Sequence, residues 1–217
     1  KSVSNMDQLD KLKKEWQNRE QELPKLSYNS IYKMLLKKSS SIVKWIFIIS
    51  IIELLFWIGL NLVTPEDNLK LINEMGIGDI MRYSNIVHFI IFSVFIFLFY
   101  KNYQSIQVTD TTKMLMQNIL KTRKTVRYFV YYNIGMLASG LIITDIYFYS
   151  RSQKLYEIMD FASKGVPEKG FATTFIISQI IIGILVVGLL IAFYWLIYGI
   201  LLKRLNNNYN ELKKMDD

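Results

Sequence analysis

The chain of 217 residues contains no cysteine, one histidine and three prolines. Without cysteine there is no disulfide framework, no thiolate nucleophile and no cysteine metal site. A single histidine excludes multi-histidine metal chemistry, and no phosphate-binding glycine loop, nucleophile elbow or HExxH motif is present. Charged residues are also scarce, at 20% against about 25% in an ordinary soluble domain. We therefore expect no cofactor, no bound metal and no enzymatic activity.

Apolar residues, in contrast, make up 52% of the chain and are concentrated in long blocks. Four blocks have the length of about 20 largely apolar residues that is needed to cross a hydrocarbon core of about 30 Å. They lie at residues 45–63, 83–103, 128–149 and 171–202. The sequence therefore predicts an all-α, integral membrane four-helix bundle whose first partner is the lipid bilayer.

The positions of Lys and Arg indicate how these spans are oriented. Of the 26 Lys and Arg residues, 20 lie in residues 1–44, 101–127 and 203–217, and the other six lie in the two intervening linkers. The positive-inside rule then places both termini and the middle linker in the cytoplasm. Topology and attraction to anionic lipid account for the formal net charge of +8. We expect no nucleic-acid partner, because no recognised nucleic-acid-binding pattern accompanies the charge.

The first 44 residues have the pattern of a cytoplasmic arm with two amphipathic helices separated by Pro24. In the first helix, three large apolar residues recur at spacings of three and four, which places them on one face. Ser27 or Asn29 can cap the second helix, which continues into the first span. An amphipathic helix of this kind can dock in a partner's groove or lie on the membrane. The candidate partner-binding residues of the first helix are Leu9, Leu12 and Trp16.

The linker between the second and third spans repeats this design. Asp110 can cap a helix that carries Leu115 and Leu120, which we add to the candidate partner-binding residues. The residues before the third span match those before the first at an offset of 83, in the order Lys, hydroxyl, three variable positions, Val, base, aromatic. Each external linker also has a short helical pattern, at residues 66–75 and 153–162. We infer two related helical hairpins.

The expected segments follow from these patterns. They are a cytoplasmic arm with a juxtamembrane helix (1–44), a first transmembrane hairpin (45–103), a cytoplasmic linker helix (104–127), a second transmembrane hairpin (128–202) and a cytoplasmic tail (203–217).

Polar residues within the predicted spans are the candidates for chemistry. Glu53 lies near the middle of the first span, where an ionised carboxylate costs at least about 2.5 kcal/mol, so we expect it to be neutral unless a cation or water reaches it. Ser50 shares its helix face, and Ser93 lies at a similar depth on the second span as a candidate hydrogen-bond partner. Glu53 is then either a proton- or cation-coupled site or polar anchor to another subunit, or a protonated side chain satisfied inside the bundle.

His88 and Asp145 form a second candidate site. Each lies about five residues inside the external boundary of its span, His88 on the second and Asp145 on the third. Side chains at equal depth on neighbouring helices can form a pair that titrates near neutral pH. The alternative is that both are solvated at the membrane surface.

The fourth span has two stripes suited to helix packing. Gly188, Ala192 and Gly199 follow one stripe, and Gln179 lies on another. Small residues let helices approach closely, and a glutamine amide can form a hydrogen bond across an interface. We expect this helix to pack mainly inside its own bundle, with a second face available to another chain.

Three runs of the sequence resemble a known family. Residues 9–17, 32–50 and 115–126 are similar to those of an uncharacterised bacterial family of four-span inner-membrane proteins, whose members are sometimes labelled β-carotene monooxygenases. The resemblance implies a bacterial inner-membrane location and genes near extracytoplasmic-function sigma factors. The monooxygenase label conflicts with this chain, because such an iron site needs several histidine ligands and the chain has only His88.

Two functions agree with these patterns. The first is a non-enzymatic accessory or regulatory membrane protein that binds a protein partner through its cytoplasmic helices or transmembrane faces, either as an anti-sigma-like protein or as a subunit of a larger complex. The second is a small proton- or ion-coupled transporter or channel, in the form of a homo-oligomer, that uses Glu53. An enzyme acting on lipid is disfavoured, because a nucleophile and metal ligands are missing.

Overall fold

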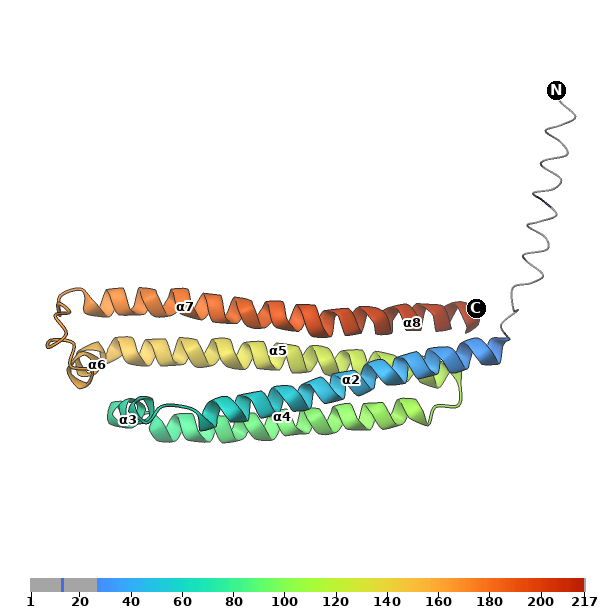
Figure 1. The fold of residues 1–217 in the computed structure, drawn as a ribbon, viewed down its shortest axis with the longest axis horizontal. Coiled ribbons are helices and arrows are strands. Elements are labelled where there is room, and N and C mark those ends of the chain that lie inside the picture. Colours follow the sequence, from blue (N-terminus) through green and yellow to red (C-terminus); the bar gives the residue numbers. More distant parts are fainter. Residues whose placement is uncertain (1–12, 14–26, 217) are drawn as a thin grey trace, which may run out of the picture.

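The computed structural model describes residue 13 and residues 27–216, and within them it contains helices and turns but no strand. Four long helical segments run side by side along the molecule, and two short helices close one end (Figure 1). The long segments are α2 (Tyr28–Leu62), α4 (Gly78–Gln107), α5 (Thr112–Ser150) and α7 (Phe171–Tyr194), the last continuing through the π-helical turn η1 (Trp195–Gly199) into α8 (Ile200–Asp216). The short helices are α3 (Glu66–Met75) and α6 (Ser152–Ile158).

Each of the four long segments is long and apolar enough to cross a membrane, which confirms the prediction of an all-α membrane bundle. The helices are longer than the predicted spans, since α2 has 35 residues and α5 has 39. At 1.5 Å per residue, α5 is about 58 Å long, roughly twice the thickness of the hydrocarbon core. The helix before the first span continues into it, as expected. The linker helix before the third span is likewise the first part of one continuous helix and not a separate element, because no proline or glycine lies at the junction.

The helix boundaries refine several predictions. Ser27, rather than Asn29, caps α2, and its side chain accepts a hydrogen bond from the backbone N–H three residues on. The cap of α5 is Thr111 and not Asp110, so that prediction was wrong by one residue. Helix α3 spans the predicted residues 66–75 and ends at Gly76, whose φ of 85° is the left-handed conformation that glycine adopts without strain. The second external helix, expected over residues 153–162, ends earlier as α6.

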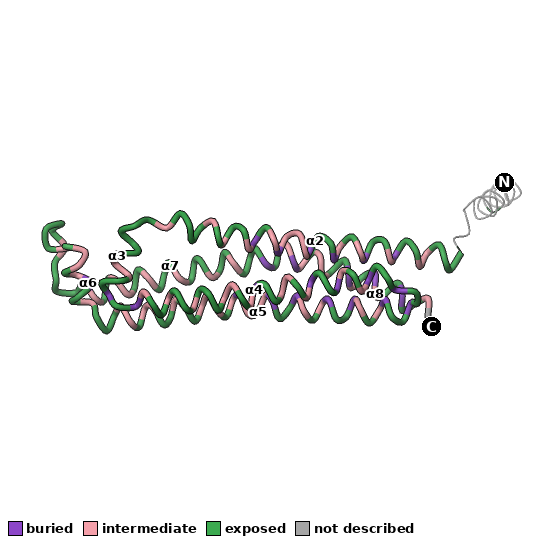
Figure 2. Tube along the Cα trace, turned by 90° about the horizontal axis from the view of Figure 1, so that it is seen from below, coloured by how far each residue is buried: buried purple, intermediate pink, exposed green. Residues whose placement is uncertain are grey.

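The bundle has two ends of different construction. The terminal end, which we define as the end where Ser27, the turn at residues 108–111 and the end of α8 meet, carries the main core (Figure 2). The buried apolar side chains of this core come from α2, α4, α5, α7, η1 and α8. They include Leu35, Val43, Ile46, Phe92, Phe99, Ile106, Leu115, Ile119, Val126, Phe129, Leu205 and Leu212.

The opposite end, which we name the capped end, is closed by α3 and α6. A smaller cluster of Met75, Ile77, Leu155 and Phe171 is buried there. Tyr147 of α5 ties this cluster to α3, because its hydroxyl donates a hydrogen bond to the backbone oxygen of Met75 at 2.8 Å. Between the two clusters α7 has no buried residue from 172 to 193. This half of the bundle therefore presents most of its apolar side chains outward, as expected for helices in lipid.

The C-terminal segment expected as a tail, residues 203–217, is helical as far as Asp216 and belongs to the bundle. Leu205 and Leu212 of α8 are fully buried, and Asn208 donates a hydrogen bond to the Ser39 hydroxyl of α2 at 3.0 Å. The two halves of the chain follow the same order of elements, a long helix, a short helix at the capped end and a long returning helix. This order is the arrangement expected of two hairpins.

Candidate functional site

Glu53 is the one carboxyl group buried in the described part of the molecule, and it is only 6% exposed. It lies on α2, and Ser50, one turn earlier, is fully buried on the same face. This confirms that the face of α2 with Glu53 looks into the bundle. The sequence pattern predicted the direction of the side chain because both polar residues follow the helical repeat of the core residues Val43 and Ile46.

Two tyrosines hold the Glu53 carboxyl group. Tyr194, the last residue of α7, donates a hydrogen bond to Oε1, and Tyr198, in η1, donates one to Oε2 at 3.1 Å. The two tyrosines are four residues apart, and both are almost fully buried. They lie at the point where the fourth span changes from an α-helix into the π-helical turn η1. Turns of this kind are rare and often occur at functional sites.

Aromatic side chains pack against the two tyrosines. Phe129 of α5 packs edge-on against both, with ring centroids 6.2 Å from Tyr194 and 5.7 Å from Tyr198. Phe92 and Phe99 of α4 pack edge-on against Phe129, at 5.0 and 5.3 Å. These rings connect α4 and α5 to the Glu53 cluster and hold the two tyrosines in an apolar surrounding.

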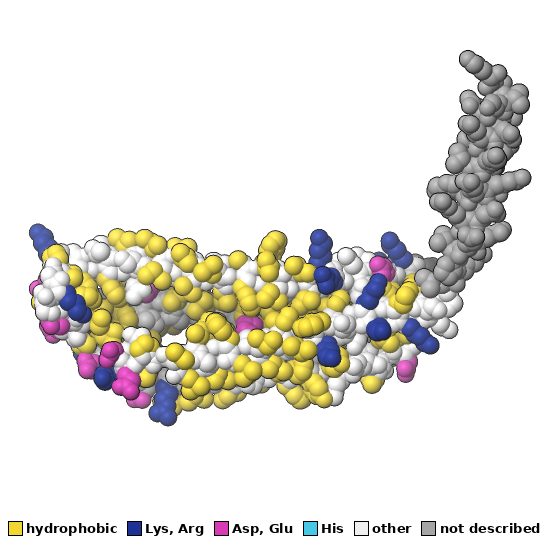
Figure 3. Space-filling view, in the orientation of Figure 1, with side chains coloured by type: hydrophobic (Ala, Val, Ile, Leu, Met, Phe, Trp, Pro, Cys, Tyr) yellow, Lys and Arg dark blue, Asp and Glu magenta, His cyan; other side chains and the backbone are white. Residues whose placement is uncertain are grey.

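On its other side Glu53 borders an apolar groove of about 520 Å³ between α2, α5 and the fourth span. Phe56 and Trp57 of α2 line one wall, and Leu190 and Phe193 of α7 line the other. The space-filling view shows a hollow in the surface toward the capped end, between α5 and α7 on one side and α2 and α4 on the other (Figure 3). Because both oxygens of Glu53 already accept hydrogen bonds, the cluster joins α2 to the fourth span as interhelical polar contacts do in membranes.

The other predicted contacts of Glu53 are absent. Ser93, expected as its partner, is exposed on α4 and donates its hydrogen bond to the backbone oxygen of Phe89 at 2.8 Å. Ser50 donates to the backbone oxygen of Phe47 on its own helix. A serine with no nearby partner satisfies its hydroxyl on the preceding turn of the same helix, and depth along the membrane does not show which face of α4 Ser93 occupies.

His88 does not pair with Asp145, so that prediction was also wrong. The His88 ring stacks on Tyr132 of α5, with centroids 5.7 Å apart, and its Nδ1 lies 3.2 Å from the Tyr132 hydroxyl. Asp145 also lies on α5, but 13 residues further along, and it is half-buried with no hydrogen bond to His88. The long α5 helix places a tyrosine, rather than the aspartate, at the level of His88.

The two stripes of the fourth span lie on different faces. Gly188 and Ala192 are exposed, and a Cβ atom built on Gly188 would meet nothing within 4 Å, so this part of the stripe lies on the outside of the bundle. Gly199 is half-buried against Trp195 of the same segment. The other stripe, which includes the half-buried Gln179, faces α5, because a Cβ atom on Gly183 would lie 3.7 Å from Leu141. The sequence did not indicate which of the two stripes packs inside the bundle, and whether the outer one contacts another chain stays a prediction.

The predicted partner-binding residues fall into three groups. Leu115 is fully buried in the main core, so it packs the bundle and is not available to a partner. Leu120 is 43% exposed on the same helix. Leu9, Leu12 and Trp16 lie outside the described residues.

Polar contacts at the terminal end were not predicted. Tyr32 of α2 donates to the backbone oxygen of Thr109 at 2.8 Å, and Asn118 of α5 donates to the Ser105 backbone oxygen and the Thr109 hydroxyl. Burial, with smaller effects of Asp110 and Tyr28, raises the pKa of Tyr32 above its ordinary value. The Tyr32 contact joins residues 77 positions apart, whereas the Asn118 contacts close the turn between α4 and α5. An asparagine on the inner side of a helix was the only feature of the sequence that could have indicated these contacts.

Comparison with known proteins gives a family and no function. A family model described as a domain of unknown function (DUF8845) matches residues 29–217, so the chain belongs to this family. No curated protein and no solved structure matches the chain.

Proposed function

We propose that this member of the DUF8845 family is a non-enzymatic accessory or regulatory protein of the bacterial inner membrane that binds a protein partner at its terminal end. The observation that supports this proposal best is the continuity of the helices. Helices α2 and α5 and the α7–η1–α8 segment extend past the length that a membrane requires and remain packed around a buried core. They form a rigid support to which the arm before Ser27 is attached.

The charge distribution supports an orientation with the terminal end in the cytoplasm. Lys33, Lys37 and Lys38 lie in the first part of α2, and Lys121 and Lys124 lie in the corresponding part of α5. These residues belong to the 20 of 26 Lys and Arg residues that lie on one side of the predicted spans.

The partner that fits this end is a protein with an apolar groove. The arm carries Leu9, Leu12 and Trp16 at helical spacing, a pattern that suits docking of one helix face into such a groove. A soluble regulator of transcription, as the family resemblance implies, and a subunit of a larger membrane complex both satisfy this chemistry. The Glu53 cluster supports a structural role for this carboxyl group, because both of its oxygens accept hydrogen bonds from tyrosines of the fourth span.

The test is to purify the tagged full chain from its native membrane in mild detergent and to measure which proteins accompany it in stoichiometric amounts. A variant with Leu9, Leu12 and Trp16 changed to alanine should lose the partner while it still inserts in the membrane. The matched control changes Asp7, Lys11 and Asn18 to alanine, which alters the opposite face of the same predicted helix with no change in net charge. Retention of every partner by the first variant, or equal loss in the control, would contradict the proposal.

A second candidate function is proton- or ion-coupled transport by a homo-oligomer. The observation that favours it is the position of Glu53 beside a groove in the middle of the predicted span. Ion or proton flux in proteoliposomes tests it, since Glu53→Gln should abolish flux while Ser93→Ala leaves it unchanged. Flux that survives in Glu53→Gln would remove this function.

A further inference from the structure

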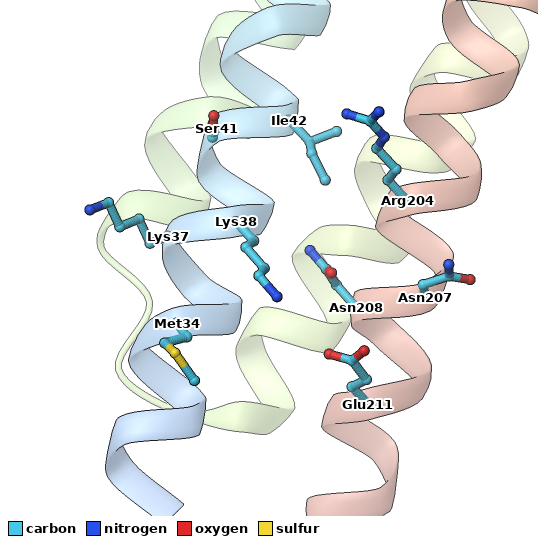
Figure 4. Close-up of a pocket in the computed structure, with 9 residues that line it drawn as sticks. All are labelled: Met34, Lys37, Lys38, Ser41, Ile42, Arg204, Asn207, Asn208 and Glu211. Atoms are coloured by element: carbon cyan, nitrogen blue, oxygen red, sulfur yellow. The ribbon is translucent and has the colours of Figure 1, made fainter. Parts of the chain in front are cut away.

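A cavity lies between α2 and α8 at the terminal end (Figure 4), and Glu53 is not among the residues that line it. It has a volume of about 650 Å³. Lys37 and Lys38 contribute to it from α2, and Arg204 and Glu211 contribute from α8. None of the functions considered above uses this cavity.

The cavity carries an excess of positive charge with no carboxylate bound to it. Two cationic side chains, Lys38 and Arg204, lie at the cavity with one anionic side chain, Glu211, and all three are exposed, whereas the Lys37 side chain points away from α8 (Figure 4). Among residues 27–216 the ion pair found is Lys70 with Asp67, which belongs to α3 at the capped end. Lys38 and Arg204 are therefore free to bind an anion that enters from outside the protein.

The side chains are arranged in order along the helix axes (Figure 4). Arg204 lies at the level of Ile42, close to the point where the first span is predicted to begin. Lys38 projects between the two helices below it, beside Asn208, and Glu211 lies further from the membrane, at the level of Met34. From the membrane outward, the cavity therefore offers Ile42 and Arg204 at one level, then Lys38 beside Asn208, and then Glu211.

We propose that this cavity binds the headgroup of an anionic glycerophospholipid from the leaflet at the terminal end. The phosphate would lie between Arg204 and Lys38, since guanidinium and ammonium groups form charge-assisted hydrogen bonds with phosphate oxygens. The acyl chains would follow Ile42 toward the hydrocarbon core. A hydroxyl-bearing headgroup such as glycerol would extend toward Asn208 and Glu211, whose amide and carboxylate oxygens can accept hydrogen bonds from hydroxyl groups.

Two features favour a lipid over free phosphate. The cavity has apolar as well as polar walls, which a small inorganic ion would not use. The cavity also lies immediately outside the predicted end of the spans, which is the depth of the headgroup phosphates. Basic pockets between membrane helices at this depth suit anionic headgroups. The excess of cations over Glu211 favours an anionic lipid over a zwitterionic one.

The experiment uses the full chain, delipidated in detergent, with binding of single lipids measured by native mass spectrometry. The probes are dioleoyl phosphatidylglycerol, phosphatidylethanolamine and phosphatidylcholine, with inorganic phosphate as a separate competitor. We expect phosphatidylglycerol to bind at least about tenfold more tightly than phosphatidylcholine, the effect of one charged hydrogen bond. The double variant Lys38→Gln with Arg204→Gln should lose about tenfold in affinity for phosphatidylglycerol.

The control separates a built site from general attraction to positive charge. Lys121→Gln with Lys124→Gln removes the same charge from α5 and should change the affinity less than about twofold, because neither residue lines the cavity. Circular dichroism and thermal unfolding without lipid confirm that both double variants are folded. Equal losses in the two variants, equal binding of the three lipids, or full displacement by inorganic phosphate would each overturn the proposal.

Discussion

A single buried residue, Glu53, links two membrane helices through its contacts with Tyr194 and Tyr198. The carboxyl group accepts one hydrogen bond at each oxygen, so α2 and the fourth span are joined by two polar contacts in a mostly apolar region. An acceptor left without donors there has no water to replace them. The tyrosine pair is therefore what allows a carboxyl group to be kept in the middle of the span.

Replacing both tyrosines by phenylalanine should lower the stability of the bundle. The change keeps the rings that pack on Phe129 but removes both donors, and leaving a buried acceptor unsatisfied costs about 1–3 kcal/mol. Thermal unfolding in detergent measures the effect. Ser93→Ala is the control and should leave stability unchanged, because Ser93 is exposed and bonded to its own helix. A double variant as stable as the original chain would show that the hydrogen bonds contribute nothing.

Tyr32 should make the terminal end sensitive to alkaline pH. Its pKa is raised by burial, and only the protonated hydroxyl can donate to the Thr109 backbone oxygen. A group whose pKa is higher in the folded state contributes stability below its unfolded pKa, about 10 for tyrosine, and loses it as pH rises through the folded value. Unfolding of the original chain and of Tyr32→Phe, compared between pH 8 and 11, should show a smaller alkaline loss in the variant. Identical profiles would refute this role.

The direction of Glu53 was predictable from the sequence, but its partners were not. Its face follows from the helical repeat of the apolar residues around it. The partners lie 141 and 145 residues further along the chain, and no local pattern shows how the fourth span is rotated about its axis. The expected partner Ser93 was chosen by depth alone, and depth does not determine which residues face each other.

At the scale of elements, apolar periodicity predicted which segments are helices but not where one helix passes into the next. The expected linker helix and third span form one helix, α5. Leu115 therefore packs in the core and does not lie on a surface that a partner could contact. The turn η1 also escaped prediction, because residues 195–199 have the composition of an ordinary apolar helix. The two external helices, in contrast, were predictable from the polar and apolar alternation between the spans.

Two leucines on α5 provide a direct test of this packing. Leu115 is fully buried and Leu120 is 43% exposed, so the same substitution by alanine should have different effects at the two positions. Leu115→Ala should destabilise the bundle by about 2–5 kcal/mol through the cavity it leaves, whereas Leu120→Ala should change stability by less than about 0.5 kcal/mol. Thermal unfolding measures both effects. Similar losses in the two variants would mean that α5 is rotated relative to the arrangement described.

At the scale of the whole molecule, the predicted orientation can be tested with single cysteines, since the chain has none of its own. Asp110 lies exposed in the turn between α4 and α5, and Ser163 lies exposed in the loop that follows α6. A membrane-impermeant maleimide should label Ser163→Cys in spheroplasts and should label Asp110→Cys only after the membrane is opened. The reverse pattern would invert the orientation and remove the cytoplasmic partner from the proposed function.

The unbroken helices have a mechanical consequence. Helices α2 and α5 contain no proline, and neither changes into a turn between the capped end and the terminal end. Neither helix therefore contains a proline hinge that would let its two ends tilt independently. We expect a displacement of α2 or α5 at the capped end to shift the same helix at the terminal end as well.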